Sequence, residues 1–115
     1  MFFEVVEMRK LKTESHSVLT AIKQRLYEVL GDEVRQIILF GSRSRGDAEE
    51  DSDYDILLLV RERTRELEDR VDDIAYEMLD RYGAVVTIFV LETETFERET
   101  HEPLFCNIRR EGILL

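Results

Sequence analysis

Residues 34–60 read VRQIILFGSRSRGDAEEDSDYDILLLV, and this stretch decides the fold of the chain. Its two ends, residues 34–40 and 54–60, are apolar and rich in isoleucine, leucine and valine, as expected of buried strands. Between them lie a turn that contains glycine and a run of acidic residues. The centre of the predicted structure is therefore a strand, a polar connection and a second strand.

Helical periodicity surrounds this centre. Apolar residues recur at the spacing of one helical face in residues 15–30, and again between Thr64, a candidate N-cap, and Gly83, a candidate C-terminal glycine. The other predicted elements are a third strand, a polar helix and a short last helix, at residues 84–91, 92–99 and 103–112. This order predicts an α/β (α+β) fold, in which a small mixed sheet of three or four strands is flanked by helices.

The composition fits one small acidic domain. The 115 residues are 43% hydrophobic and carry a formal net charge of −10, so we expect a single domain over residues 1–115 with one core. Such a charge repels phosphate backbones and argues against direct nucleic-acid binding. Glu4 directly follows the apolar N-terminus, which leaves no stretch long enough for a signal peptide or membrane span. A cytoplasmic location with no membrane partner is expected.

The turn after the first strand has the features of an anion site. Gly41 allows a ligand to approach the backbone closely, and Ser42 adds a hydroxyl to the free amides of a helical turn. Arg43 and Arg45 add positive charge, and Gly46 lets the chain turn away. The spacing matches neither a P-loop nor a dinucleotide fingerprint. A plain turn with solvated arginines is the alternative interpretation, and the carboxylates downstream favour the anion site.

Two carboxylates open the second strand. Asp53 and Asp55 are two residues apart, so strand alternation directs both side chains to one face. Two like charges at the start of an apolar strand resist desolvation, and a divalent cation between them removes that cost. The alternative is an exposed strand edge where water solvates both acids. A turn for phosphate beside a pair of acids for metal is what a nucleoside triphosphate with magnesium requires.

These residues resemble the signature of the DNA polymerase β-like nucleotidyltransferases, and most of all that of their small members, the minimal nucleotidyltransferases. The motifs that carry the likeness are Gly41-Ser42, Arg45-Gly46, Ser52-Asp53 and Asp55-Ile56-Leu57. The resemblance extends over nearly the whole chain. It implies transfer of AMP from ATP to an acceptor hydroxyl. It also implies that Gly41 and Ser42 hold the β- and γ-phosphates, and that Asp53 and Asp55 are the catalytic residues and bind two magnesium ions.

The resemblance also implies a partner protein. Among relatives the usual partner is a small helical protein of the HEPN class, a ribonuclease toxin. The chain would then be an antitoxin that transfers AMP to a tyrosine of that toxin and silences it. A homo-oligomer is a further arrangement compatible with the sequence. A small-molecule acceptor is disfavoured, because the sequence shows no additional domain to select one.

One position departs from the family pattern. The third carboxylate of the family usually lies on the next core strand, where this chain has Thr87. Threonine can form hydrogen bonds but supplies no negative charge, and Glu92, on the opposite face of the strand, is a poor substitute. The alternative function is therefore a catalytically weak or inactive module that neutralises its partner by binding alone. Towards the end of the chain, core packing is predicted for Phe96, Leu104 and Phe105.

Overall fold

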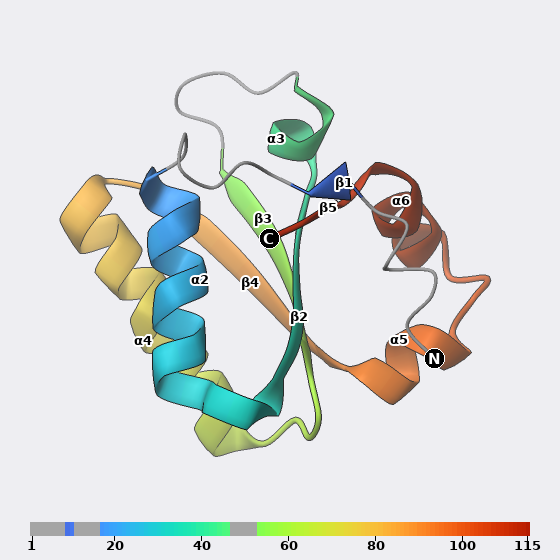
Figure 1. Cartoon of the computed structure of the whole chain (residues 1–115), viewed down its shortest axis with the longest axis horizontal. Helices are drawn as coiled ribbons and strands as arrows, with labels where there is room; N and C mark the ends of the chain where they lie inside the picture. Colours follow the sequence, from blue (N-terminus) through green and yellow to red (C-terminus); the bar gives the residue numbers. More distant parts are fainter. Residues whose placement is uncertain (1–8, 11–16, 47–52) are drawn as a thin grey trace.

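The computed structural model describes residues 9–10, 17–46 and 53–115. Ser52, the acidic run 47–51 and the apolar N-terminal residues lie outside the described residues. The described elements follow along the chain in the order β1 (Arg9–Lys10), α2 (Ser17–Leu30), η2 (Gly31–Glu33), β2 (Val34–Phe40), α3 (Ser42–Arg45), β3 (Tyr54–Val60), α4 (Arg65–Tyr82), β4 (Val86–Glu92), α5 (Thr93–Arg98), α6 (Pro103–Glu111) and β5 (Ile113–Leu114) (Figure 1).

The strands form one mixed sheet of five strands in the order β1-β5-β2-β3-β4. The central pair, β2 and β3, is antiparallel, whereas β3 and β4 are parallel and are connected through α4 (Figure 1). The predicted strands at 34–40 and 54–60 are confirmed, and the third begins two residues later than predicted, at Val86. The sequence did not predict β1 and β5, which have two residues each.

Each face of the sheet is covered by its own pair of helices (Figure 1). Alternation along β3 sends Ile56, Leu58 and Val60 into the core shared with α2 and α4. Leu57 and Leu59 point to the other face, where they pack with Phe96 of α5 and Ile108 of α6. Asp55 precedes Leu57 by two residues, so its side chain belongs to the face of α5 and α6.

Local signals position the helices as the sequence predicted. The Thr64 hydroxyl accepts a hydrogen bond from the Leu67 amide at 3.1 Å, and Gly83 ends α4 in a left-handed conformation with φ of 65°. The predicted core packing is confirmed for Phe96, which is buried, whereas Leu104 is 43% exposed and does not belong to the core. Leu104, in the first turn of α6, lines an open groove along β4 instead, which explains its exposure.

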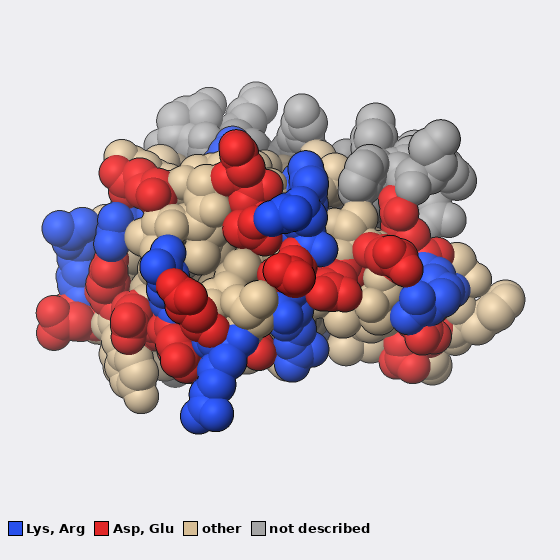
Figure 2. All heavy atoms as spheres, turned by 90° about the horizontal axis from the view of Figure 1, so that it is seen from below, with Lys and Arg blue, Asp and Glu red and all other residues tan. Residues whose placement is uncertain are grey.

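The described surface mixes both charge signs. Figure 2 shows acidic and basic side chains interleaved over the face seen from below. Ion pairs join separate parts of the chain, such as Arg25 of α2 with Glu77 of α4 at 2.8 Å and Arg61 with Glu33 at 2.6 Å. None of the helices in the part of the chain that the structure describes has the length and apolar character needed to cross a membrane.

Candidate functional site

The turn between β2 and α3 is tightly organised around Gly41. Gly41 has φ of 78° and ψ of −158°, a conformation that is essentially restricted to glycine. Its carbonyl accepts hydrogen bonds from the amides of Ser44 and Arg45 at 3.1 and 3.2 Å, and from the Ser44 hydroxyl at 2.8 Å. Ser44 is buried, with 2% of its surface exposed, so it fixes the turn from inside. Gly46 ends α3 in the left-handed region.

Ser44 is a site residue that sequence reasoning missed. It lies in the polar run between Gly41 and Gly46, of which only Ser42 and the two arginines were predicted to contribute to the site. A signal was nevertheless present, because serine hydroxyls commonly bond to nearby backbone groups in turns. Ser42, which was expected to face the phosphates, is the first residue of α3 and is partly exposed.

Asp55 lies at the start of β3 between two neighbouring strands. It is paired with Phe40 of β2 and with Thr87 of β4, and its side chain is partly buried, whereas Asp53 is exposed. Burial raises the pKa of Asp55, the negative charge of Asp53 raises it further, and Arg45 opposes both effects. The charge of Asp53 therefore acts on Asp55, although Asp53 lies one residue before β3 and only Asp55 belongs to the strand.

Direct packing joins the turn to the carboxylate. If Gly41 carried a Cβ atom, that atom would lie 2.4 Å from Oδ2 of Asp55. Such a distance is far inside van der Waals contact, so the carboxylate occupies the space that the missing side chain leaves. The glycine thus allows an acid on β3 to lie directly against the backbone of the turn, and the two halves of the predicted site meet.

The two arginines of the turn have different neighbours. The guanidinium of Arg43 lies over the ring of Tyr54, 3.9 Å from its centroid, which is a cation–π contact. Arg45 is exposed, and its Nη1 lies 3.5 Å from Oε2 of Glu111 at the end of α6. Arg45 also acts on Asp55, since its charge lowers the pKa of that acid. Positive charge therefore borders the carboxylate pair on the side of α3.

Thr87 occupies the place beside Asp55 where a third carboxylate was expected. The parallel register pairs the two residues directly. Glu92 lies at the other end of β4, where its Oε2 accepts a hydrogen bond from the Arg63 amide at 3.0 Å, so it does not replace Thr87. Among the described residues, no group of three or more histidine, cysteine or acidic side chains is arranged to hold a metal ion.

The donor chemistry of the pair still suits magnesium. Carboxylate oxygens are the ligands that this hard cation prefers, and one or two carboxylates together with substrate phosphates are its usual protein site. The raised pKa of Asp55 reflects burial and repulsion from Asp53, and a cation would relieve both. Asp53 and Asp55 therefore fit a site that needs the phosphates of a nucleotide to complete it.

Comparison with known proteins agrees with this geometry. The family described as nucleotidyltransferase domain matches residues 17–112. The chain belongs to this family. The resemblance predicted from the residues around Gly41 and Asp55 is thereby confirmed, and the matched range includes every candidate site residue of this nucleotidyltransferase.

Two archaeal relatives illustrate the relationship. A provisionally named protein adenylyltransferase of Methanocaldococcus jannaschii is 32% identical over 96 residues, which cover 81% of this nucleotidyltransferase and 65% of the relative. The protein adenylyltransferase MntA of Thermococcus cleftensis is 56% identical over 45 residues, 39% of this chain and 43% of MntA. The matches thus span less than two thirds of either relative.

Solved structures with this fold include toxin–antitoxin complexes. One, a toxin–antitoxin complex with AMP-PNP, has a TM-score of 0.57 at 18% identity and covers 81% of this chain and 68% of that chain. Another contains a tri-AMPylated HEPN toxin of Shewanella oneidensis with its MNT antitoxin, with a TM-score of 0.51 at 17% identity over 84% and 70% of the two chains. These similarities confirm the predicted fold, a mixed sheet flanked by helices.

Proposed function

We propose that this nucleotidyltransferase transfers AMP from ATP to a hydroxyl group of a partner protein. The observation that carries the proposal is the packing of the Asp55 carboxylate against Gly41. That contact brings an acid suited to a metal ion next to a turn suited to phosphates. Membership of the family and the names of the two archaeal relatives support the same reaction.

Each site residue has a role in this proposal. Gly41 and Ser42 bind the β- and γ-phosphates through the turn, and Arg43 and Arg45 add positive charge. Asp53 and Asp55 hold two magnesium ions, which when bound would neutralise charge on the triphosphate and on the departing pyrophosphate. The acceptor oxygen forms a bond to the α-phosphorus, the bond from that phosphorus to the bridging oxygen breaks, and pyrophosphate leaves. The hydroxyl proton passes to water.

We also propose the kind of acceptor. The acceptor would be a tyrosine of a helical HEPN-class toxin, and the chain would be its antitoxin in the cytoplasm, where ATP is available. Support comes from the fold shared with complexes of a HEPN toxin and an MNT antitoxin, and from a toxin in one of them that carries AMP.

The proposal is tested by ATP binding and by transfer. Calorimetry should detect ATP binding that requires magnesium, and labelled AMP should appear on a tyrosine of the co-expressed toxin. The double variant Asp53→Asn/Asp55→Asn should lose both. The matched control is Asp72→Asn/Asp80→Asn, which makes the same change of charge at two exposed residues of α4. Equal labelling by wild type and the site variant would overturn the proposal.

A second function has one observation in its favour. Thr87 stands beside Asp55 in place of a third carboxylate, which favours a module that neutralises the toxin by binding alone. Toxin neutralisation in cells that persists in the Asp53→Asn/Asp55→Asn variant would support this alternative. Neutralisation that is lost together with AMP transfer would support the enzyme.

A further inference from the structure

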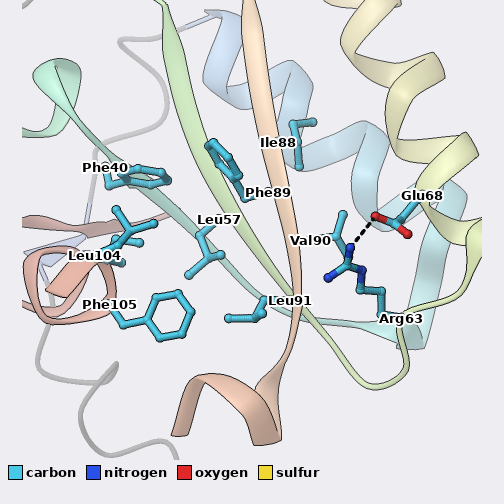
Figure 3. A pocket seen from close by; sticks show the side chains of 11 residues that line it. Phe40, Leu57, Arg63, Glu68, Ile88, Phe89, Val90, Leu91, Leu104 and Phe105 are labelled. Atoms are coloured by element: carbon cyan, nitrogen blue, oxygen red, sulfur yellow. Dashed lines mark ion pairs between the residues drawn. The ribbon is translucent and has the colours of Figure 1, made fainter. Parts of the chain in front are cut away.

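An apolar groove follows the edge strand β4 and extends around it, and its volume is about 330 Å³. On the carboxylate face it is lined mainly by Phe40, Leu57, Phe89, Leu91, Leu104 and Phe105, and on the other face by Ile88, Val90 and Glu68 (Figure 3). This volume is within the range of about 300–1,000 Å³ that is usual for small-molecule sites. We refer to it as the β4 groove. None of its lining residues was assigned a role in holding nucleotide or metal.

Strand register connects the β4 groove to the carboxylates. Leu57, in the groove, follows Asp55 on the same face of β3, about 7 Å further along the strand. Phe40, at the near end of the groove, is the direct partner of Asp55 on β2. On β4, Thr87 is paired with Asp55 and Phe89 with Leu57. On β3, the groove therefore begins at the next side chain after Asp55 on the same face, which is Leu57.

Together with the proposed phosphate site, the order of the strands favours the acceptor as the reactant on this side of the site. The phosphate turn follows β2, and α3 lies at that end of the strand (Figure 1). Asp55 is on β3, the next strand, and β4 lies beyond it. In-line displacement requires the attacking oxygen and the leaving pyrophosphate to lie on opposite sides of the phosphorus. With the leaving group held at Gly41 and Ser42, the attacking oxygen approaches from β4.

We propose that the β4 groove binds the aromatic ring of the acceptor tyrosine. The inference rests on the proposed function and specifies its acceptor side chain. A tyrosine has an apolar body and a polar tip, and the tip lies about as far from its Cα as Asp55 lies from Leu57. With the ring in the groove, the hydroxyl reaches the carboxylates. Its oxygen then bonds to the α-phosphorus, pyrophosphate leaves, and the phenol proton passes to water.

The walls of the groove suit an aromatic ring. The rings of Phe40 and Phe89 lie 5.8 Å apart at an angle of 46°, and a third ring can pack edge to face against them. Phe89 is 47% exposed, and Leu104 faces it from α6 (Figure 3), so the docked ring would cover apolar surface that is otherwise open to water. On the other side of β4 from these rings, an ion pair between Arg63 and Glu68 at 3.3 Å borders the groove (Figure 3).

A serine or threonine acceptor does not fit this arrangement. Its hydroxyl is too close to its own backbone to reach Asp55 from the groove, and it has no ring to cover Phe89. The groove therefore favours tyrosine over serine and threonine, because the tyrosine side chain is longer and has a larger apolar area. The nucleobase of ATP is the other flat ring in the reaction, and measuring ATP affinity in a groove variant distinguishes the two rings.

The experiment compares Phe89→Ala with Tyr76→Ala, an exposed aromatic residue of α4 that serves as the matched control. The acceptor probe is N-acetyl-tyrosinamide, with N-acetyl-serinamide as the comparison. We expect Phe89→Ala to raise KM for the tyrosine probe about tenfold, with kcat and the affinity for ATP unchanged. Leu104→Ser, on the opposite wall of the groove, should act in the same direction. Tyr76→Ala should leave KM unchanged.

Direct binding gives a readout that does not depend on transfer. In NMR spectra of the wild type, the tyrosine probe should shift the amide signals of Phe89 and Leu91 and give contacts between its ring and Phe89. An unchanged KM in both groove variants, or equal use of the serine probe, would overturn the inference. A loss of ATP affinity in Phe89→Ala would also overturn it, because the groove would then hold the nucleobase.

Failure of the proposed function would look different. In that case ATP would not bind in a magnesium-dependent manner, or the Asp53→Asn/Asp55→Asn variant would behave like wild type. The NMR titration would still decide whether the groove binds a phenol ring. Binding of the ring would support the groove as an aromatic site, and its absence would overturn it.

Discussion

Gly41 combines two requirements that only glycine meets. Its positive φ disfavours any side chain, and the space where a Cβ atom would lie is taken by the carboxylate of Asp55. Four described glycines have a positive φ, at positions 31, 41, 46 and 83, and at the other three nothing lies within 4 Å of an added Cβ. Comparing an alanine variant at Gly41 with one at another positive-φ glycine therefore separates the effect of backbone strain from the effect of displacing Asp55.

The Gly41→Ala variant should bind ATP more weakly and should also be less stable than the wild type. Gly46→Ala is the control, because Gly46 also has a positive φ, of 83°, but an added Cβ meets nothing within 4 Å. Gly46→Ala should lose about 1–2 kcal/mol in urea unfolding, the usual cost of a left-handed residue with a side chain, and Gly41→Ala should lose more, because its conformation is essentially restricted to glycine and the Cβ overlaps Asp55. Only Gly41→Ala should also weaken magnesium-dependent ATP binding, by at least about tenfold, because Asp55 must move. Equal ATP affinities in the two variants would contradict this account of the turn.

Thr87→Asp should make the site more dependent on metal. The variant places a third carboxylate directly beside Asp55. Without magnesium we expect a loss of about 1–2 kcal/mol in unfolding free energy, because like charges are brought together. Magnesium should restore that loss and increase AMP transfer. The comparison is with Thr87→Asn, which has a similar shape but no charge, and an identical magnesium response of the two variants would count against a metal site here.

At the residue scale, the sequence located the turn and the acid that packs against it, because glycine followed by serine marks the turn and Asp55 opens the next strand. The convergence of Asp53 and Asp55 on one metal site remains a prediction, and Asp53 lies one residue before β3. The cation–π contact of Arg43 with Tyr54 and the approach of Arg45 to Glu111 were not predictable, because they depend on how α3 and α6 are placed in space. The magnesium, ATP and acceptor assignments remain predictions.

At the scale of elements, the length of a strand decides how well its sequence reveals it. β2 and β3 have seven residues each, with a continuous apolar pattern and flanking glycine or acidic residues, and their bounds were predicted. β5 has only Ile113 and Leu114, too few to show a period, and it pairs with residues about 75 positions earlier. A strand of two residues is recognised by its pairing with neighbouring strands, and the local sequence does not reveal that pairing.

The ion pair between α2 and α4 should make the free energy of unfolding depend on pH in the acidic range. Hydrogen bonds from Arg25 hold the pKa of Glu77 below its ordinary value of 4.5, so the folded state binds this proton less readily than the unfolded state. The pair therefore stabilises the fold fully at pH values above 4.5, and this stabilisation is lost as the pH falls through the lower pKa that Glu77 has in the folded state. Because both side chains are partly exposed, we expect at most about 1 kcal/mol.

Urea unfolding at several pH values tests this expectation. The difference in unfolding free energy between wild type and Glu77→Gln should be constant near neutral pH and shrink below about pH 4.5. Asp73→Asn, which changes an exposed acid of the same helix, controls for the loss of one negative charge. A difference that stays constant down to pH 3 would show that the Arg25–Glu77 pair does not stabilise the fold.

At the scale of the whole molecule, charge repulsion should dominate the response to salt. The net charge of −10 is distributed over only 115 residues. Screening of this repulsion stabilises the compact state, whereas the exposed ion pairs that salt weakens contribute little each. We expect urea unfolding to show a gain of about 1 kcal/mol between 20 mM and 300 mM, with sodium chloride and potassium chloride alike, which corresponds to a few degrees in Tm. A loss of stability would mean that the ion pairs outweigh the repulsion.

The position of β5 has a consequence for how the chain is made. Within the described structure, β5 lies between β1 and β2, and Arg9 and Lys10 join the sheet through Ile113 and Leu114. Arg9 and Lys10 therefore cannot pair in the sheet until the ribosome has synthesised Ile113 and Leu114, more than a hundred positions later. During translation β2, β3 and β4 can already associate, while the outer edge of β2 waits for its neighbour. The sheet is thus completed only after β5 has been synthesised, and until then the edge of β2 presents unpaired backbone groups that could pair with another chain.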